Sequence, residues 1–319
     1  PTKHLDAISH TFIRILHAVI SSADVIHFQG VGPSLLSFIP RMVSPRAMVI
    51  TTFHSIDRYQ LKWGFIARRI LRLAEWTAVK LAHETIAVSK EIQDYVRVEY
   101  NKDITYIPNG IGDVPTAAAH LIQSQFNLER HGYILVVSRL VPHKGIHYLL
   151  DAFAKITTDK KLVIVGSGAF TDAYVQTLEQ KAQKDRRVLL CGAQTGLVLE
   201  ELYANAFAFV HPSSAEGLSI TLLEAMNAGC PILASDIRSN ADVLGNRGWY
   251  FTCDDVGSLK KQLERLLALL PDTLQSRGRV AQAHVQQRYH WDDIADQTLA
   301  LVDAVSRARK IASKRLAVA

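Results

Sequence analysis

HPSSAEGLSITLLEAMNAGCPILAS, residues 211–235, is the stretch that decides the fold of this chain. It follows an apolar segment and contains a Pro/Ser turn, a loop, an apolar helix, a Gly-Cys-Pro break and a second apolar strand. Backbone N–H groups and the helix dipole at such a loop-to-helix junction favour an anion such as phosphate. Glu216 in the loop and Glu224 on the helix would accept hydrogen bonds from sugar hydroxyls. A nucleotide sugar carries both phosphate and sugar hydroxyl groups, so it is a ligand that this segment could bind.

The rest of the chain alternates short apolar strands with helices. Strands covered on both faces of a parallel sheet are predicted at 133–138, 161–165, 187–191, 207–211 and 231–234. Four earlier strands are predicted at 23–28, 47–53, 85–88 and 105–107. Helices are predicted at 62–82, 90–99, 145–156 and 172–184, and again from Leu259 with breaks at Pro271 and near His290. The pattern predicts two parallel α/β units with a ligand at the carboxyl ends of their strands.

Length and turn residues predict two domains. The chain has 319 residues, and Gly110–Ala119, rich in Gly, Pro and small residues, is the predicted linker. The domains are therefore expected at 1–115 and 116–290. The first shows fewer βα units than a doubly wound domain usually has, and the chain begins with Pro1 rather than Met. We expect that opening βα units of the first domain are absent from this sequence.

Composition is that of an ordinary globular protein, with 48% hydrophobic and 21% charged residues. No apolar run reaches the roughly 18 residues of a membrane span. Because the 3 cysteines are scattered along the chain, we expect no disulfide framework and a cytoplasmic location. The formal net charge of +6 indicates an anionic partner, for which nucleotide phosphate, anionic lipid and nucleic acid are the candidates.

Two basic residues follow the strand predicted at 133–138. Arg139 and Lys144 would sit at its carboxyl end, where two cations could neutralise a diphosphate. The alternative is that both are solvated loop charges. Gly166 and Gly168 follow the next strand in a lone GxG, which can be a tight turn only. NAD is not expected, because the third glycine and the acidic ribose ligand of a dinucleotide fingerprint are missing.

The acidic and histidine candidates also have structural interpretations. Glu216 could be a solvated loop acid, and Thr221–Glu224 fits a capping box. His54 ends the strand at 47–53 and could donate to a sugar hydroxyl, although a lone histidine is more often structural. Asn109 is first a turn signal. Structural roles are expected for His27, His143, His147 and His211. No metal is expected, because the sequence has no close His/Asp/Glu grouping.

Residues 58–80 alternate basic and apolar side chains. The basic ones are Arg58, Lys62, Arg68, Arg69, Arg72 and Lys80, and Trp63, Phe65, Ile66, Ile70, Leu73 and Trp76 lie between them. Such a helix can lie on an anionic membrane, or it can be an ordinary helix whose apolar stripe faces the core. A nucleic-acid partner is not expected, because the basic residues fall at strand ends and on one helix rather than along an aromatic-lined groove.

In order, the segments resemble a retaining GT-B glycosyltransferase of family 4, glycosyl transferases group 1. They are DVIHFQG, TTFHS, TIAVSKEIQDY, ITYIPNGI, ILVVSRLVPHKGIHYLLDAF, LVIVGSG, ELYANAFAFVHPSSAEGLSITLLEAMNAGCPILAS and YHWDDIA. Glu216-x7-Glu224 with SRL-x3-KG upstream is the specific combination. The resemblance implies an α/β fold of two Rossmann-like doubly wound domains facing a cleft, the first domain incomplete. It also implies a C-terminal helix, 291–319, that returns to the first domain.

The same resemblance implies roles for individual residues. Arg139 and Lys144 are similar to the pair that holds the donor diphosphate. Glu216 is similar to the acid that contacts the donor sugar, and Glu224 to the acid that grips the ribose hydroxyls. His54 matches a histidine near the reacting centre. The backbone of Gly217, Leu218 and Ser219, together with Asn109 and Gly166, completes the implied binding set.

We therefore expect a metal-independent transferase that needs no cofactor and moves a sugar from a nucleotide diphosphate sugar to a hydroxyl acceptor. The acceptor would be a glycan, a lipid-linked glycan or a small molecule. The basic helix is consistent with a peripheral position on the inner, anionic face of the membrane. The alternatives are a GT-B nucleotide-sugar epimerase or phosphorylase, and a truncated, inactive nucleotide-binding module.

Overall fold

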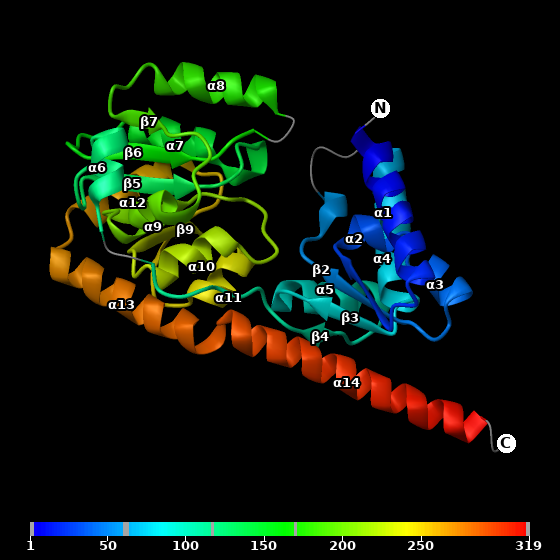
Figure 1. Ribbon diagram of the computed structural model, residues 1–319. Coiled ribbons are helices and arrows are strands. Elements are labelled where there is room, and N and C mark those ends of the chain that lie inside the picture. Colours follow the sequence, from blue (N-terminus) through cyan, green and yellow to red (C-terminus); the bar gives the residue numbers. More distant parts are fainter. Residues whose placement is uncertain (1–2, 60–63, 116–117, 169–170, 317–319) are drawn as a thin grey trace. The chain divides into compact units, whose positions relative to one another are not determined.

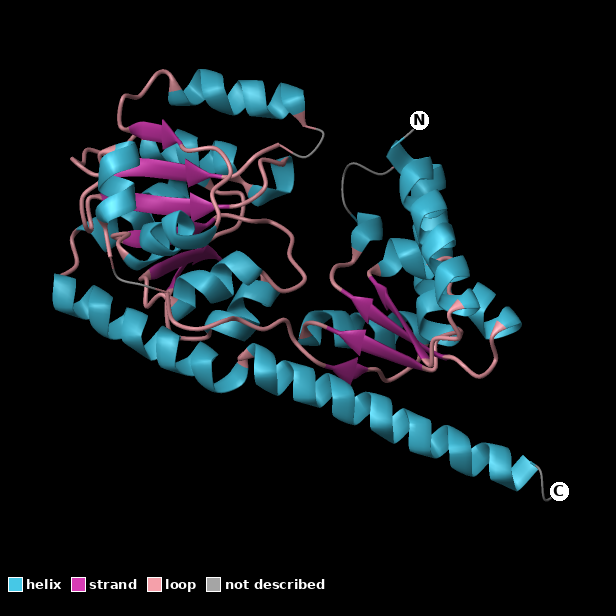
Figure 2. Ribbon diagram, viewed as in Figure 1, coloured by secondary structure: helices cyan, strands magenta, loops and turns pink. Residues whose placement is uncertain are grey.

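The computed structural model describes residues 3–59, 64–115, 118–168 and 171–316 (Figure 1). It divides into two compact units, which we call unit 1 (Pro1–Asn109 with Asp292–Ala319) and unit 2 (Gly110–Trp291). Each unit has a parallel sheet covered by helices (Figure 2). Part of the helix predicted at 62–82, including Lys62 and Trp63, lies outside the described residues.

The sheet of unit 1 confirms the four predicted strands within two residues at each end. They are β1 (Val25–Gln29), β2 (Met48–Phe53), β3 (Glu84–Ala87) and β4 (Thr105–Tyr106), which pair in that order, all in parallel. The helices are α1 (Lys3–Ile20), α2 (Val31–Ser34), α3 (Phe38–Val43), η1 (Asp57–Tyr59), α4 (Phe65–Lys80), α5 (Lys90–Tyr100) and α14 (Trp291–Leu316).

Buried residues of β2 alternate between two hydrophobic clusters, as the two-residue period of a strand requires. Val49 packs in one cluster with Ile15 of α1. Met48 and Ile50 pack in another cluster with Ile294 of α14. Because both faces are covered, every residue of β2 is buried, which explains why its sequence does not alternate between apolar and charged side chains.

Unit 2 contains a six-stranded parallel sheet in the order β10-β9-β8-β5-β6-β7. Its strands are β5 (Tyr133–Val137), β6 (Lys161–Val165), β7 (Val188–Leu190), β8 (Ala208–His211), β9 (Ile232–Ser235) and β10 (Trp249–Phe251). The five predicted strands are confirmed. The edge strand β10 was not predicted, because three residues are too few for a periodic signal, and only its pairing with β9 defines it.

The helices of unit 2 precede, connect and follow its strands. They are α6 (His120–Phe126), η2 (Pro142–Lys144), α7 (Ile146–Phe153), α8 (Asp172–Ala182), α9 (Gly196–Ala204), α10 (Ile220–Asn227), α11 (Arg238–Leu244), α12 (Val256–Leu267) and α13 (Pro271–Arg288). A Cβ atom on Gly278 of α13 would lie 2.0 Å from the carbonyl oxygen of Gly229. The turn that follows α10 therefore lies directly against α13.

The described residues of the predicted linker at 110–119 make several hydrogen bonds within unit 2. Ile111 forms a bridge with His290, and the Asn227 side-chain amide donates to the carbonyl oxygens of Gly112 and Asp113. The amide of Asn205 donates to Ala118 O at 2.6 Å. These contacts give the segment the hydrogen-bond partners that a solvated linker would take from water.

Candidate functional site

The loop from β5 to α7 carries two of the predicted site residues. Its last turn, η2, ends at Gly145 with φ +67°, a left-handed conformation that favours glycine. A Cβ atom there would lie 2.0 Å from the carbonyl oxygen of Pro212, so the segment after β8 lies directly against this turn. Ser214 N–H also donates to His143 O at 2.8 Å. This close approach brings Lys144 beside the loop that contains Glu216.

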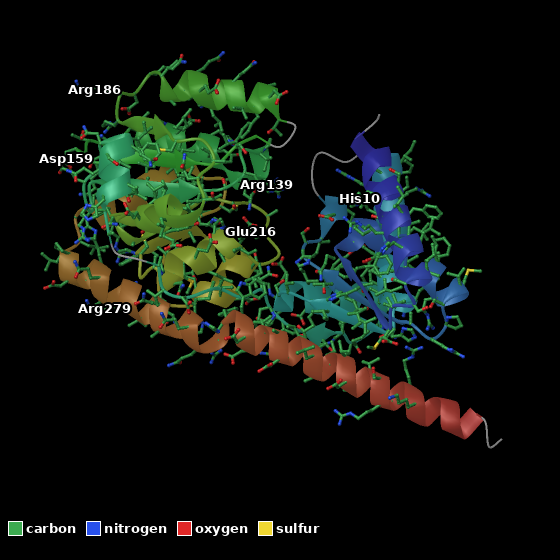
Figure 3. All side chains as sticks on the ribbon, viewed as in Figure 1. His10, Arg139, Asp159, Arg186, Glu216 and Arg279 are labelled. Atoms are coloured by element: carbon green, nitrogen blue, oxygen red, sulfur yellow. The ribbon has the colours of Figure 1, made fainter. Side chains whose placement is uncertain are left out.

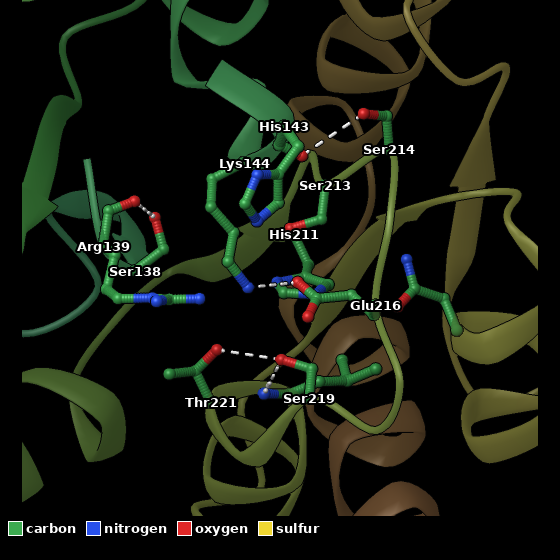
Figure 4. A network of polar contacts seen from close by, with 12 residues as sticks. Ser138, Arg139, His143, Lys144, His211, Ser213, Ser214, Glu216, Ser219 and Thr221 are labelled. Carbon is green, nitrogen blue, oxygen red and sulfur yellow. Dashed lines mark hydrogen bonds and ion pairs between the residues drawn. The ribbon is translucent and has the colours of Figure 1, made fainter. Parts of the chain in front are cut away.

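Lys144 and Glu216 form an ion pair that is almost completely removed from water (Figure 4). The side chains are 11% and 9% exposed, and Lys144 Nζ donates to Glu216 Oε1. His211, at the end of β8, is 1% exposed, and its Nε2 lies 3.2 Å from the same oxygen. That contact lacks the alignment of a hydrogen bond. Among the described residues, Glu216 Oε2 has no hydrogen-bond partner.

Electrostatics keep Glu216 ionised. Burial disfavours its charged form, but the neighbouring His211 ring and the Lys144 ammonium outweigh burial and hold the pKa of Glu216 well below its usual value. The site therefore contains a fixed carboxylate whose second oxygen is available to accept a hydrogen bond.

Arg139 lies near the start of the same loop, two residues after β5. Its side chain is exposed, and its guanidinium forms no ion pair with any residue in the described ranges. Figure 4 shows it extending toward Lys144 and Glu216. Arg139 and Glu216 lie at the edge of unit 2 to which the arrows of β5 and β6 point (Figures 2 and 3). An exposed cation thus stands at the carboxyl ends of the strands, beside a buried cation.

Ser219, rather than Thr221, caps α10. The Ser219 side chain accepts a hydrogen bond from Leu222 N–H at 3.3 Å, and its backbone is extended with φ −77° and ψ 113°. The predicted capping box at Thr221–Glu224 is therefore wrong, because Thr221 is already inside the helix. Gly217 and Leu218 lie in the buried turn immediately before the cap.

The carboxylate of Glu224 contacts a buried tyrosine. Tyr203 of α9 donates from its hydroxyl to Glu224 Oε2 at 2.9 Å. Burial raises the pKa of Glu224, and the hydrogen bond from Tyr203 opposes that shift only in part. Glu224 is thus a half-buried acid held in one orientation, as recognition of a hydroxyl pair requires.

Gly166 has a packing reason to be glycine. Its φ is +142°, and a Cβ atom would lie 1.8 Å from the carbonyl oxygen of Ser138. The turn after β6 therefore touches the turn after β5 through backbone alone. The structural interpretation of the GxG segment explains this residue without a ligand.

The two predicted site residues of unit 1 are His54, which follows β2, and Asn109, which ends the first of the two stretches that form the unit. His54 Nε2–H donates to Gln29 Oε1 at 2.8 Å, which places the ring proton on Nε2. Burial lowers the pKa of His54, and Asp57 opposes that shift. His27 contacts Thr52 Oγ1 at 2.7 Å, in agreement with its expected structural role. Asn109 is half-buried and is the last residue of the first part of unit 1.

Two residues of the unit 2 site were not predicted from the sequence. His211 was expected to be structural, yet it contacts the Glu216 carboxylate. Tyr203 gave no signal at all, because its partner Glu224 lies 21 residues further along the chain. One signal could have indicated that His211 belongs to the site. It lies at the carboxyl end of an apolar strand, directly before Pro212. Within the described residues, no group of three or more His, Cys, Asp or Glu residues could hold a metal ion.

Models of known protein families match most of the sequence. The model of the family "Glycosyl transferases group 1" matches residues 120–282, about half of the chain. The model "Glycosyltransferase Family 4" matches residues 3–113. Family similarity therefore covers both units.

Individual proteins give the same result. The O-antigen chain mannosyltransferase RfbU of Salmonella typhimurium is 30% identical over 230 residues, 70% of this chain and 62% of that protein. The chain spans 57–62% of the length of three such relatives. Among solved structures, sucrose-phosphate synthase from Thermosynechococcus elongatus has a TM-score of 0.82 at 22% identity, covering 94% of this chain and 78% of that one. Anabaena Alr3699/HepE in complex with UDP has a TM-score of 0.78 at 22% identity, covering 91% and 82%. These structures show that the fold is GT-B.

Proposed function

Because the chain belongs to the glycosyl transferases group 1 family, we propose that it transfers a sugar from a nucleotide diphosphate sugar to a hydroxyl acceptor. The buried Lys144–Glu216 pair carries this proposal. A buried ion pair is costly to form, and its position at the carboxyl ends of the strands is where α/β proteins bind ligands. A UDP complex of the similar Anabaena protein supports a nucleotide-containing ligand.

In the proposed site, Lys144 and Arg139 bind the donor diphosphate. Both cations would stabilise the negative charge that develops on the leaving phosphate, so the site would need neither a metal nor another cofactor. Glu216 Oε2 would accept a hydrogen bond from a hydroxyl of the donor sugar. The backbone of Gly217, Leu218 and Ser219 would complete the binding set, and the Gly166 turn lies at the end of the neighbouring strand β6.

The proposed reaction retains the configuration of the sugar. The bond between the anomeric carbon and the phosphate oxygen breaks while the acceptor oxygen attacks from the same face. The acceptor proton passes to the leaving phosphate oxygen, which becomes a better base as its charge grows. The roles of His54 near the reacting centre and of Asn109 in the binding set stay predictions from the sequence.

Replacement of Glu224 with glutamine is expected to weaken nucleotide binding by about 10- to 150-fold, because a hydrogen bond to a charged group contributes about 1.5–3 kcal/mol. Calorimetric titration with UDP, GDP and ADP would first identify the base, and the variant would then be titrated with the nucleotide that binds. Glu264→Gln on α12, whose partly exposed carboxylate pairs with Lys260, is the matched control. An unchanged Kd in folded Glu224→Gln would remove Glu224 from the proposed ribose site.

We also propose that α4 lies on an anionic membrane. Large apolar side chains of this helix are exposed instead of facing the core: Phe65 71%, Ile66 74%, Ile70 47%, Leu73 54% and Trp76 44%. Arg68 and Arg69 are exposed among them, and the Arg69 guanidinium lies 4.7 Å from the centre of the Phe65 ring. One apolar stripe of the helix, with Leu71, Ala74 and Ala78, does face the core, as in an ordinary amphipathic helix, so the exposed apolar side chains form a second apolar face. Apolar area beside arginines fits the interface of an anionic bilayer.

No described helix is long and apolar enough to cross a bilayer, so contact through α4 would be peripheral. Ile66→Ser with Ile70→Ser is expected to reduce binding to phosphatidylglycerol vesicles at least tenfold, since each lost side chain removes about 1.5–3 kcal/mol of burial. Co-sedimentation and the blue shift of tryptophan fluorescence would measure it. Val98→Ser, an isolated residue 85% exposed on α5, is the control. Equal loss in the control, or binding that survives in the double variant, would contradict the proposal.

A further inference from the structure

Three N–H-bearing side chains of unit 1 meet at the amino ends of the strands, opposite the end where His54 follows β2. Arg41 comes from α3, His83 immediately precedes β3, and Arg309 lies on α14. Arg41 Nη1 contacts His83 Nε2, and Arg309 Nη2 donates to Pro45 O at 2.7 Å. Three separate elements therefore converge on one small region.

The hydrogen bonds of His83 are in conflict. Its Nδ1 accepts from Val49 N–H at 2.8 Å, so a neutral ring must carry its proton on Nε2. Burial, with Arg309 and Arg41 nearby, lowers the pKa of His83 to about 4, so the ring is neutral at pH 7. Nε2–H then faces the guanidinium of Arg41, which has only donors. Both groups are donors, and an acceptor oxygen that faces both nitrogens from one side would satisfy them.

The charges point to an anion. Burial and the charge of Arg41 lower the pKa of Arg309. Within the described residues, no carboxylate forms an ion pair with Arg41 or Arg309. Positive charges that lie together raise the local concentration of anions. A planar guanidinium matches the oxygens of a phosphate group particularly well.

We propose that Arg41, His83 and Arg309 bind a phosphate group. One phosphate oxygen would accept from both Arg41 and His83 Nε2–H, and another would accept from the remaining N–H groups of Arg309. Met42 and Val43 on the same helix are 76% and 60% exposed, so the phosphate of a phospholipid, whose chains would lie beside them, is the favoured source over a free phosphate. This site lies outside the residues assigned to donor binding.

The test follows the His83 ring directly. The ring resonances of isotope-labelled protein would be recorded by NMR during titration with inorganic phosphate, glycerol 3-phosphate, and vesicles of phosphatidic acid or phosphatidylcholine. We expect a saturable shift of the Nε2 signal with a phosphate-bearing ligand, and at least a tenfold weaker affinity in Arg41→Gln/Arg309→Gln. Arg46→Gln, which removes an exposed charge three residues after the helix ends, should change the affinity less than twofold.

The outcomes separate the two sources. A shift with inorganic phosphate or glycerol 3-phosphate supports a site for free phosphate, and a shift with phosphatidic acid vesicles alone supports the lipid headgroup. The proposal is overturned if no ligand shifts the His83 signal, or if Arg46→Gln weakens binding as much as the double variant does. Since the readout is a resonance of unit 1, binding of phosphate at the proposed donor site of unit 2 would not be mistaken for it.

Discussion

Replacement of Lys144 with alanine is expected to lower kcat/KM for sugar transfer by about 10²–10³-fold. Lys144 is the buried cation of the proposed diphosphate site, and loss of one such stabilising group typically costs that much in rate. Transfer from the nucleotide sugar identified by calorimetry would be measured under conditions of low substrate. Lys184→Ala, an exposed lysine of unit 2, should retain full activity.

The same substitution also leaves the Glu216 charge buried and unpaired, which is expected to destabilise the protein by about 3–5 kcal/mol. Lys144→Met with Glu216→Gln removes both charges and should recover more than half of that loss in urea unfolding. Transfer should nevertheless stay low in the double variant. Recovery of stability with loss of transfer separates a role in the reaction from a role in folding. Normal transfer by a folded Lys144→Ala protein would exclude the assigned role.

Replacement of Gly145 with alanine is expected to destabilise the protein by about 3–5 kcal/mol and to abolish transfer. A left-handed backbone costs a non-glycine residue about 1–3 kcal/mol, and overpacking adds a similar amount. The overpacking here is severe, since the new Cβ atom would lie 2.0 Å from Pro212 O. The substitution would push the segment after β8 away from the turn that holds Lys144, and so separate Lys144 from Glu216.

Gly192 provides the matched control for this prediction. Its φ of +65° is nearly that of Gly145, but a Cβ atom there would have nothing within 4 Å. Gly192→Ala should therefore cost only the strain of the left-handed backbone, about 1 kcal/mol. Urea unfolding of the two variants measures the difference. Equal destabilisation would show that the close approach at Pro212 is not what constrains Gly145.

Much of the fold could be predicted because strands buried on both faces need apolar side chains at every position. Runs such as Tyr133–Val137 and Lys161–Val165 therefore stand out in the sequence. β10 did not stand out, because its three residues belong to the sheet through pairing with β9 alone. The exposed face of α4 shows a different limit. An apolar stripe predicts that a surface is covered, but the sequence does not say by what.

The sequence by itself determined which chemical groups this protein has at the ends of its strands. Arg139, Lys144, Glu216 and Glu224 were identified as candidates because each follows a local pattern of strand, turn and helix. Only the tertiary structure decided their partners. Lys144 contacts a carboxylate 72 residues away, and that carboxylate also contacts His211. The physical reason is that a local pattern depends on neighbouring residues, whereas ionisation and hydrogen bonding in a buried site depend on which distant segments the sheet brings together.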